Sequence, residues 1–233
     1  MTYAGRLDPM AEGVLLVLSG DAIAEKQKYL DLPKTYTFQI LWGFETDTLD
    51  ILGKVSNIGC LTVPEELKIR EVLEKSIGKF EQKYPVYSSK PVNGTPMFQL
   101  AREGKLEELQ TQTHEVELIS AEFISRHTIS SELLLQYIVA KVNLVTGDFR
   151  QKEIIEKWQD TVSRTPLDIP VAEQSTLQDF AFTIDTIEVV VGSGFYVRQF
   201  VADLAEKLGT VAITFHIKRT KIGEIGCGTK MQD

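Results

Sequence analysis

Residues 5–18 read GRLDPMAEGVLLVL. Pro9 disfavours helical backbone at the residue before it, so Asp8 is expected to be extended. The apolar run 14–18 follows Gly13 and predicts a short strand buried on both faces. A carboxylate on a loop beside a rigid strand suits catalysis, because the scaffold fixes the group that the loop carries. The alternative is an aspartate that only stabilises a turn.

A second informative stretch, GSGFYVR, occupies residues 192–198 and reads as a junction from strand to helix. Arg198 falls in the first turn of the helix predicted over 196–208, where a cation opposes the helix dipole. Such an arginine calls for a nearby anion, and Asp8 can supply it. An aspartate paired in this way stays ionised at neutral pH. The alternative is an arginine exposed to solvent.

The rest of the chain mixes strands and helices without regular alternation. Alternating or continuous apolar residues predict further strands over 34–42, 115–124, 183–191 and 213–217. Helical spacing predicts helices over 22–31, 64–78, 97–103, 132–144 and 150–162. Segment 45–50 reads as a polar loop and 83–96 as a loop or irregular extended segment. This order favours an α+β fold with a mixed, largely antiparallel sheet flanked by helices.

Composition describes an ordinary globular protein of 233 residues with a net charge of −8. No apolar run approaches the roughly 20 residues of a membrane span, and no signal peptide is recognisable. Two cysteines far apart suit a reducing cytosol, so we expect a cytoplasmic protein. The overall acidity argues mildly against nucleic-acid binding.

The charge is distributed unevenly along the chain. Segment 106–188 holds 15 acidic and 6 basic side chains, a net charge of −9, whereas segments 78–105 and 196–221 each carry +3. Charges within about 10 Å set the field at a binding surface, so the average charge says little about a groove. The alternative is that all three are ordinary solvated surfaces.

Signatures of phosphate-binding loops and metalloenzymes are missing from the sequence. The three histidines, His114, His127 and His216, are not spaced as metal ligands. We therefore predict no metal and no cofactor.

Five motifs resemble, in order, those of the TruB family of tRNA pseudouridine synthases. They lie at residues 5–15, 34–53, 87–104, 194–198 and 219–223. The resemblance covers residues 4–104 and 189–225. It implies a pseudouridine synthase catalytic domain over 1–225, an expanded or inserted acidic region at 106–188, and a polar tail at 226–233.

The resemblance also implies a reaction. The family isomerises a uridine of the tRNA T-loop (uridine-55) to pseudouridine after flipping it out of the folded RNA. Asp8 corresponds to the nucleophile, and attack on the sugar or on the base both remain open. The expected partner is the tRNA elbow, bound by a monomer without membrane contact, and the two basic segments suit an RNA-binding face.

Residue roles follow from the same resemblance. Arg198 would hold the Asp8 carboxylate, Asp50 would complete an arginine–aspartate network, and Tyr36 would stack on the flipped base and take part in proton removal. The positions expected to bind substrate are Tyr196, Ile217, Tyr87, Lys90 and Arg102.

The sequence departs from the family pattern in several places. Tyr3 stands where a histidine helps to flip the base, and Arg6 is similar to the arginine of ribosomal pseudouridine synthases. The chain also looks short at its N-terminus and without a PUA domain. Two alternatives stay open: a non-catalytic RNA-binding or tRNA-folding protein, and an enzyme acting on ribosomal RNA.

Overall fold

The computed structural model describes residues 1–59, 63–105, 112–164 and 181–226. Both cysteines, and the predicted polar tail beyond residue 226, lie outside these ranges.

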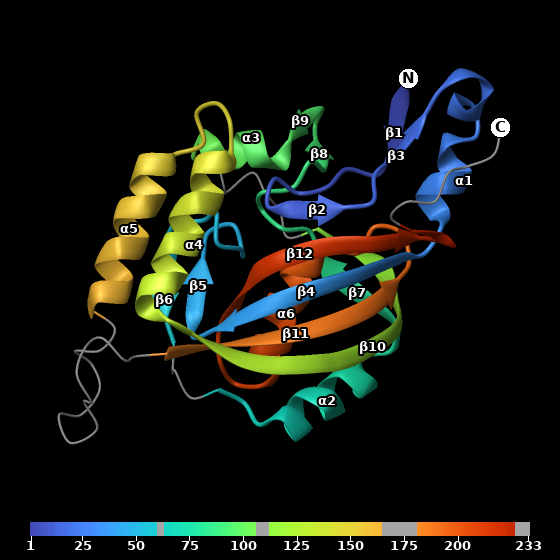
Figure 1. The fold of residues 1–233 in the computed structure, drawn as a ribbon. Helices are drawn as coiled ribbons and strands as arrows, with labels where there is room; N and C mark the ends of the chain where they lie inside the picture. Colours follow the sequence, from blue (N-terminus) through green and yellow to red (C-terminus); the bar gives the residue numbers. More distant parts are fainter. Residues whose placement is uncertain (60–62, 106–111, 165–180, 227–233) are drawn as a thin grey trace.

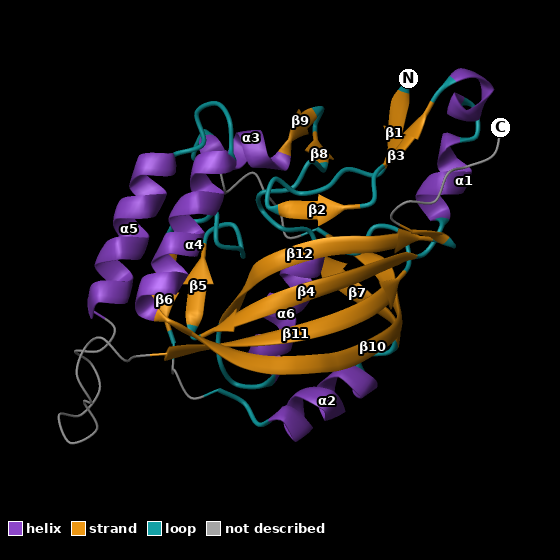
Figure 2. Ribbon diagram, in the orientation of Figure 1, coloured by secondary structure: helices purple, strands orange, loops and turns teal. Residues whose placement is uncertain are grey.

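A central antiparallel sheet forms the body of the molecule (Figures 1 and 2). Its strand order is β13-β12-β4-β11-β10-β7, and the short β2 pairs with β12 as the one parallel neighbour among the described strands. Their bounds are β2 Ala11–Gly13, β4 Lys34–Trp42, β7 Gly78–Lys83, β10 Thr113–Ser130, β11 Ala181–Val191, β12 Ala212–Ile222 and β13 Ile225–Gly226. The predicted α+β class with a largely antiparallel sheet is confirmed.

Strand β4 occupies the middle of this sheet and has the bounds that its alternating pattern predicts. Phe38 and Ile40 are completely buried, and the strand pairs along its length with β11 and β12. Side chains of a strand alternate between faces, so this spacing places one apolar row against the core.

Helices cover the sheet and its ends (Figure 2). The described helices are α1 Lys26–Asp31, α2 Glu66–Lys75, α3 Met97–Arg102, α4 Ser131–Leu144, α5 Gln151–Arg164 and α6 Val197–Lys207, with a 3₁₀ turn η1 at Gly20–Ile23. Helix α6 packs against β12, and α4 packs against α5 as an antiparallel hairpin at one end of the sheet (Figure 1). The predicted helices therefore form, except that 22–31 divides into η1 and α1.

The prediction of a buried strand over 14–18 is wrong, and the segment predicted as a polar loop at 45–50 is a loop only after Thr46. Strand β3 covers only Leu16–Leu18, and Leu15 and Val17 are 45% and 55% exposed, because β3 pairs with β1 (Thr2–Ala4) in a separate two-stranded sheet. Segment 45–50 contains the end of β5 (Phe44–Thr46), which pairs with β6 (Val55–Ile58), and its polar side chains at 46, 48 and 50 are buried. The remaining small sheet joins β8 (Pro91–Val92) to β9 (Thr95–Pro96) within the irregular segment.

Part of the acidic segment 106–188 belongs to the central sheet. It contains β10 and most of β11, which pair with each other and with β7 and β4. An ion pair joins these two strands: Asp185 is completely buried and accepts from Nε of the partly exposed Arg126 at 2.7 Å, and it also accepts from Trp42 Nε1 at 2.7 Å. Among the described residues of this segment, helices α4 and α5 lie outside the sheet, and the insertion at 106–188 stays a prediction.

Gly13 is required by the close approach of β2 to β12. Its φ is +110°, and a Cβ there would lie 2.2 Å from the carbonyl oxygen of Arg219. We expect Gly13→Ala to lower the free energy of unfolding by about 2–4 kcal/mol, since backbone would have to move. Gly20→Ala is the matched control, because Gly20 also has positive φ but nothing lies within 4 Å of its added Cβ. Urea titrations of both variants measure these losses, and that of Gly20→Ala should be about 1 kcal/mol. Equal losses would contradict the close-approach argument.

Candidate active site

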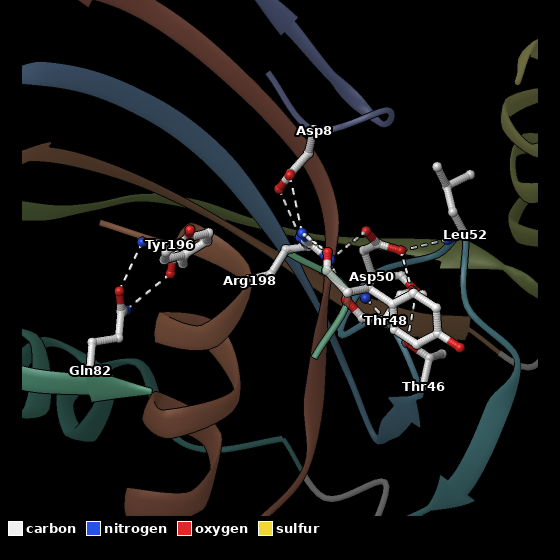
Figure 3. A network of polar contacts seen from close by, with 9 residues as sticks. Asp8, Thr46, Thr48, Asp50, Leu52, Gln82, Tyr196 and Arg198 are labelled. Atoms are coloured by element: carbon white, nitrogen blue, oxygen red, sulfur yellow. Dashed lines mark hydrogen bonds and ion pairs between the residues drawn. The ribbon is translucent and has the colours of Figure 1, made fainter. Parts of the chain in front are cut away.

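Asp8 and Arg198 form a two-point ion pair (Figure 3). Arg198 Nε lies 2.7 Å from Asp8 Oδ2, and its Nη2 donates to Oδ1 at 3.1 Å. The arginine side chain is 4% exposed, whereas that of Asp8 is 34% exposed. The expected pairing is confirmed, and the alternative of an exposed arginine is wrong. The Asp8 carboxylate is thus held by the buried Arg198 guanidinium and is still accessible to solvent.

The rest of the guanidinium joins segments distant in sequence. Nη1 donates to the carbonyl of Thr48 at 2.8 Å, and Nη2 donates to the carbonyl of Tyr87 at 3.1 Å. Asp50 Oδ2 lies 3.7 Å from Nη1. Desolvation opposes the charge, yet the Asp8 and Asp50 carboxylates hold the pKa of Arg198 above its usual value.

Asp50 is the buried partner of this network. Its Oδ1 accepts from Thr48 Oγ1 at 2.6 Å and from the Leu52 amide at 2.9 Å. Burial raises the pKa of its carboxyl to about 6, although Arg198 and these hydrogen bonds act in the opposite direction. The 3.7 Å separation from Arg198 explains why the cation offsets desolvation only in part.

The loop that carries Asp50 is tightly folded. Leu49 has a φ of +61°, and Thr46 Oγ1 both donates to the Asp50 carbonyl and accepts from its amide. A Cβ on Gly53 would lie 2.4 Å from Thr48 Oγ1, so the loop closes only around a residue without a side chain. Its polar residues satisfy one another, which is why a hydrophilic segment is buried here.

Two cavities meet at the loop bearing Asp8. The smaller, of about 100 Å³, contains Asp8 with Tyr36, Tyr196 and Ile217. The larger, of about 250 Å³, contains Asp8, Asp50, Arg198, Tyr87 and Arg102 together with Phe98 and Phe149. The structure therefore brings eight of the nine predicted site residues to these cavities.

Lys90 is the exception among the predicted residues. Within the described part of the chain it lines neither cavity, and its Nζ lies 4.7 Å from the centre of the Tyr84 ring.

Sequence comparison assigns the chain to a family. Residues 1–138 match the N-terminal domain of the TruB family pseudouridylate synthases. The chain belongs to the TruB family.

Curated TruB-family relatives agree with this. The chain is 31% identical over 196 residues to tRNA pseudouridine synthase B of Aquifex aeolicus (strain VF5), covering 81% of this chain and 66% of that protein. It is 35% identical over 222 residues to tRNA pseudouridine synthase B of Thermosipho melanesiensis (strain DSM 12029 / CIP 104789 / BI429), covering 95% and 54%. The chain spans 42–66% of the length of the first three relatives.

A solved structure shares the TruB-family fold. A chain of the Cbf5-Nop10-Gar1 complex superposes with a TM-score of 0.53 at 15% identity, covering 97% of this chain and 41% of that chain. At this identity the likeness concerns the fold alone.

Residues that sequence reasoning did not assign to the site hold the lining of the smaller cavity in place. Gln82 is completely buried and holds the Tyr196 backbone from both sides: its Oε1 accepts from the amide at 2.8 Å and its Nε2 donates to the carbonyl at 3.0 Å (Figure 3). Tyr196 also packs edge-on against Tyr84 and His114, whose rings stack on each other. Since Gln82 is 114 residues away, local pattern offered no signal for this clamp.

Arg219 secures the loop that presents Asp8. It is 1% exposed, its Nε donates to the Val14 carbonyl at 2.7 Å, and its Nη2 donates to the Gly5 carbonyl at 3.2 Å. The two ends of the Asp8 loop are thus fastened to β12. The motif at 219–223 was the available signal, although it did not indicate this contact.

The described residues contain no group of three or more side chains suited to a metal ion. Among the described helices, none combines the length and hydropathy that a membrane span requires.

Asp50 should make stability depend on pH. Its pKa is raised in the folded state, so the unfolded state loses this proton first and stability falls as pH rises through about 6. Asp50→Asn removes this titration. Denaturant titrations give the free energy of unfolding of each protein. We expect the difference between them, wild type minus variant, to decrease as the pH rises from about 4 to about 7. A constant or increasing difference would contradict the assigned direction.

Arg198→Lys should be strongly destabilising. A lysine retains the charge but cannot reach Asp8, Thr48 and Tyr87 together, so buried carbonyls lose their donors. We expect a loss of about 2–4 kcal/mol in the free energy of unfolding. Arg70→Lys is the control, because the exposed Arg70 pairs with Glu66 and lies 4.9 Å from the centre of the Phe123 ring, contacts that a lysine can also make, and it should change stability by less than about 1 kcal/mol. Similar effects of both variants in urea titrations would refute the bridging role.

Proposed function

We propose that this chain isomerises a uridine to pseudouridine in tRNA, with uridine-55 of the T-loop as the target. The observation that carries the proposal is the Asp8 carboxylate, oriented by buried Arg198 and accessible where two cavities meet. The relatives named tRNA pseudouridine synthase B supply the substrate class. The acting unit would be the domain over residues 1–225.

Asp8 is the proposed nucleophile. The guanidinium fixes both of its oxygens, and their remaining lone pairs can attack an incoming ribose or uracil carbon. Asp8 bonds to the carbon that it attacks, and the bond from N1 to C1′ breaks. The uracil rotates, a bond from C5 to C1′ forms, and the bond to Asp8 breaks, which returns the free carboxylate. The proton on C5 leaves and N1 acquires one, so substrate and product have the same atoms and the reaction is balanced without a cofactor.

The smaller cavity is the proposed site for the flipped uracil. Tyr36, Tyr196 and Ile217 give it aromatic and apolar walls next to Asp8. Burial raises the pKa of the Tyr36 hydroxyl, so this group is protonated at neutral pH. That state suits stacking and hydrogen bonding to the base. As the acceptor of the C5 proton, Tyr36 would first have to lose its own proton.

RNA binding in this proposal depends on local charge. Segments 78–105 and 196–221 are each +3, and they contribute Arg102 and Arg198 to the larger cavity. Flipping a base from a folded loop exposes its aromatic faces, and the rings around Asp8 can replace the lost stacking. Lys90 and Arg102 are the proposed contacts to the phosphate backbone and the base faces near the tRNA elbow.

The experiment compares wild type with Asp8→Asn on an unmodified tRNA transcript, with pseudouridine mapped by position. We expect product at uridine-55 from the wild type and at least about 10³-fold less from the variant, because the amide is a poor nucleophile. Asp21→Asn is the matched control, since Asp21 is exposed in η1 and should leave the rate unchanged.

Three other outcomes would each contradict a different part of the proposal. Equal product from both proteins would exclude Asp8 as nucleophile. Salt-dependent tRNA binding by a folded wild type without any product would favour a tRNA-folding protein. Product on ribosomal RNA fragments alone would move the substrate away from tRNA.

A further inference from the structure

The connection between α4 and α5 forms part of the larger cavity. Figure 1 shows this connection at the same end of the molecule as α3. Phe149 lines the cavity with Asp8, and the Arg102 guanidinium of α3 lies 5.2 Å from the centre of the Phe149 ring. The match to the TruB family description ends at residue 138, so Phe149 lies beyond it.

The connection is held in a defined conformation. Gln151 Oε1 accepts from the Phe149 amide at 2.9 Å, and its Nε2 donates to the carbonyls of Val145 and Gly147 at 2.9 and 2.8 Å. Gly147 and Arg150 both have positive φ, 83° and 60°. One glutamine side chain therefore fixes the turn that presents Phe149.

Arg150 anchors the same turn to the site. Its Nη1 lies 2.6 Å from Asp47 Oδ2, and its guanidinium lies 5.1 Å from the centre of the Tyr87 ring. Asp47 belongs to the tight loop that carries Asp50, and the Tyr87 carbonyl accepts from Arg198. The α4–α5 hairpin is thus fastened to two segments that also hold the catalytic ion pair.

The lining of the larger cavity suits a nucleobase. The Arg102 guanidinium lies 5.2 Å from the centre of the Phe149 ring and 5.9 Å from that of the Phe98 ring. Both rings are half-buried, so they retain exposed surface. Aromatic rings and arginine planes are the surfaces on which unpaired bases stack.

The position of the larger cavity beside Asp8 indicates which base of the RNA it would bind. Asp8 borders both cavities, and the smaller one is already the proposed site of the target uracil. A second base that reaches the larger cavity must therefore come from the same strand, close to the target nucleotide.

We propose that the larger cavity binds a second unpaired nucleobase of the substrate RNA, from a nucleotide adjacent to the target uridine, and that Phe149 with Arg102 forms its stacking surface. This inference rests on the proposed function. It makes the α4–α5 hairpin a determinant of which RNA loops bind.

The test measures binding of a T-loop RNA hairpin by fluorescence anisotropy in an Asp8→Asn background, so that no turnover occurs. The hairpin is prepared intact and with an abasic nucleotide on either side of the target uridine. We expect Phe149→Ala to weaken binding of the intact hairpin about 5- to 100-fold. It should have little effect on the hairpin that is abasic at the stacked position.

Two further variants separate stacking from folding. Phe149→Trp should retain the affinity of the parent, because it keeps an aromatic face. Leu144→Ala is the matched control on the same hairpin, since Leu144 is 73% exposed and outside the cavity lining, and should bind as the parent does. The buried Trp158 of α5 reports by fluorescence whether each variant keeps the hairpin packed.

Equal weakening of the intact hairpin and both abasic hairpins by Phe149→Ala, or no weakening of any, would overturn the proposal. Failure of the proposed function is read separately, as absence of pseudouridine when the protein with intact Asp8 is incubated with the intact hairpin and with the full transcript.

Discussion

The site depends on the ion pair and hydrogen bonds of the buried Arg198 guanidinium. A cation removed from water is unfavourable unless charges and acceptors surround it. Here they come from the Asp8 loop, the loop at residues 48–50 and the segment at Tyr87. These segments are far apart in sequence, so the full set of contacts to the guanidinium exists only in the folded chain. The same contacts that satisfy the arginine also orient the carboxylate.

Other buried polar side chains extend this arrangement into the sheet. Arg219 on β12 holds both ends of the Asp8 loop, and Gln82 on β7 holds Tyr196 where α6 begins. Each connects a strand to a segment that lines a cavity. Asp8 and Asp50 therefore lie on loops, whereas Arg198 lies in α6 and Tyr36 lies on β4, and the regular elements set the positions of the loops.

The acidic segment has two distinct parts. Its strands β10 and β11 belong to the central sheet and are joined by the ion pair of Arg126 with the buried Asp185. Its helical hairpin reaches the site through Phe149 and Arg150. The net charge of the whole segment therefore does not indicate that its α4–α5 turn places Phe149 and Arg150 beside the cavity.

Sequence by itself determined the strand at 34–42 and the helices other than the one predicted at 22–31, and it indicated the pairing of Asp8 with Arg198 as one of two alternatives. Alternation, helical spacing and a cation in a first helical turn are local signals with direct physical causes. Only the tertiary structure decided that Thr48 and Asp50 are buried, that Leu15 and Val17 are exposed, and that Gln82 and Phe149 belong to the site. Those outcomes depend on which distant segment packs against each residue, and neither periodicity nor composition encodes that choice.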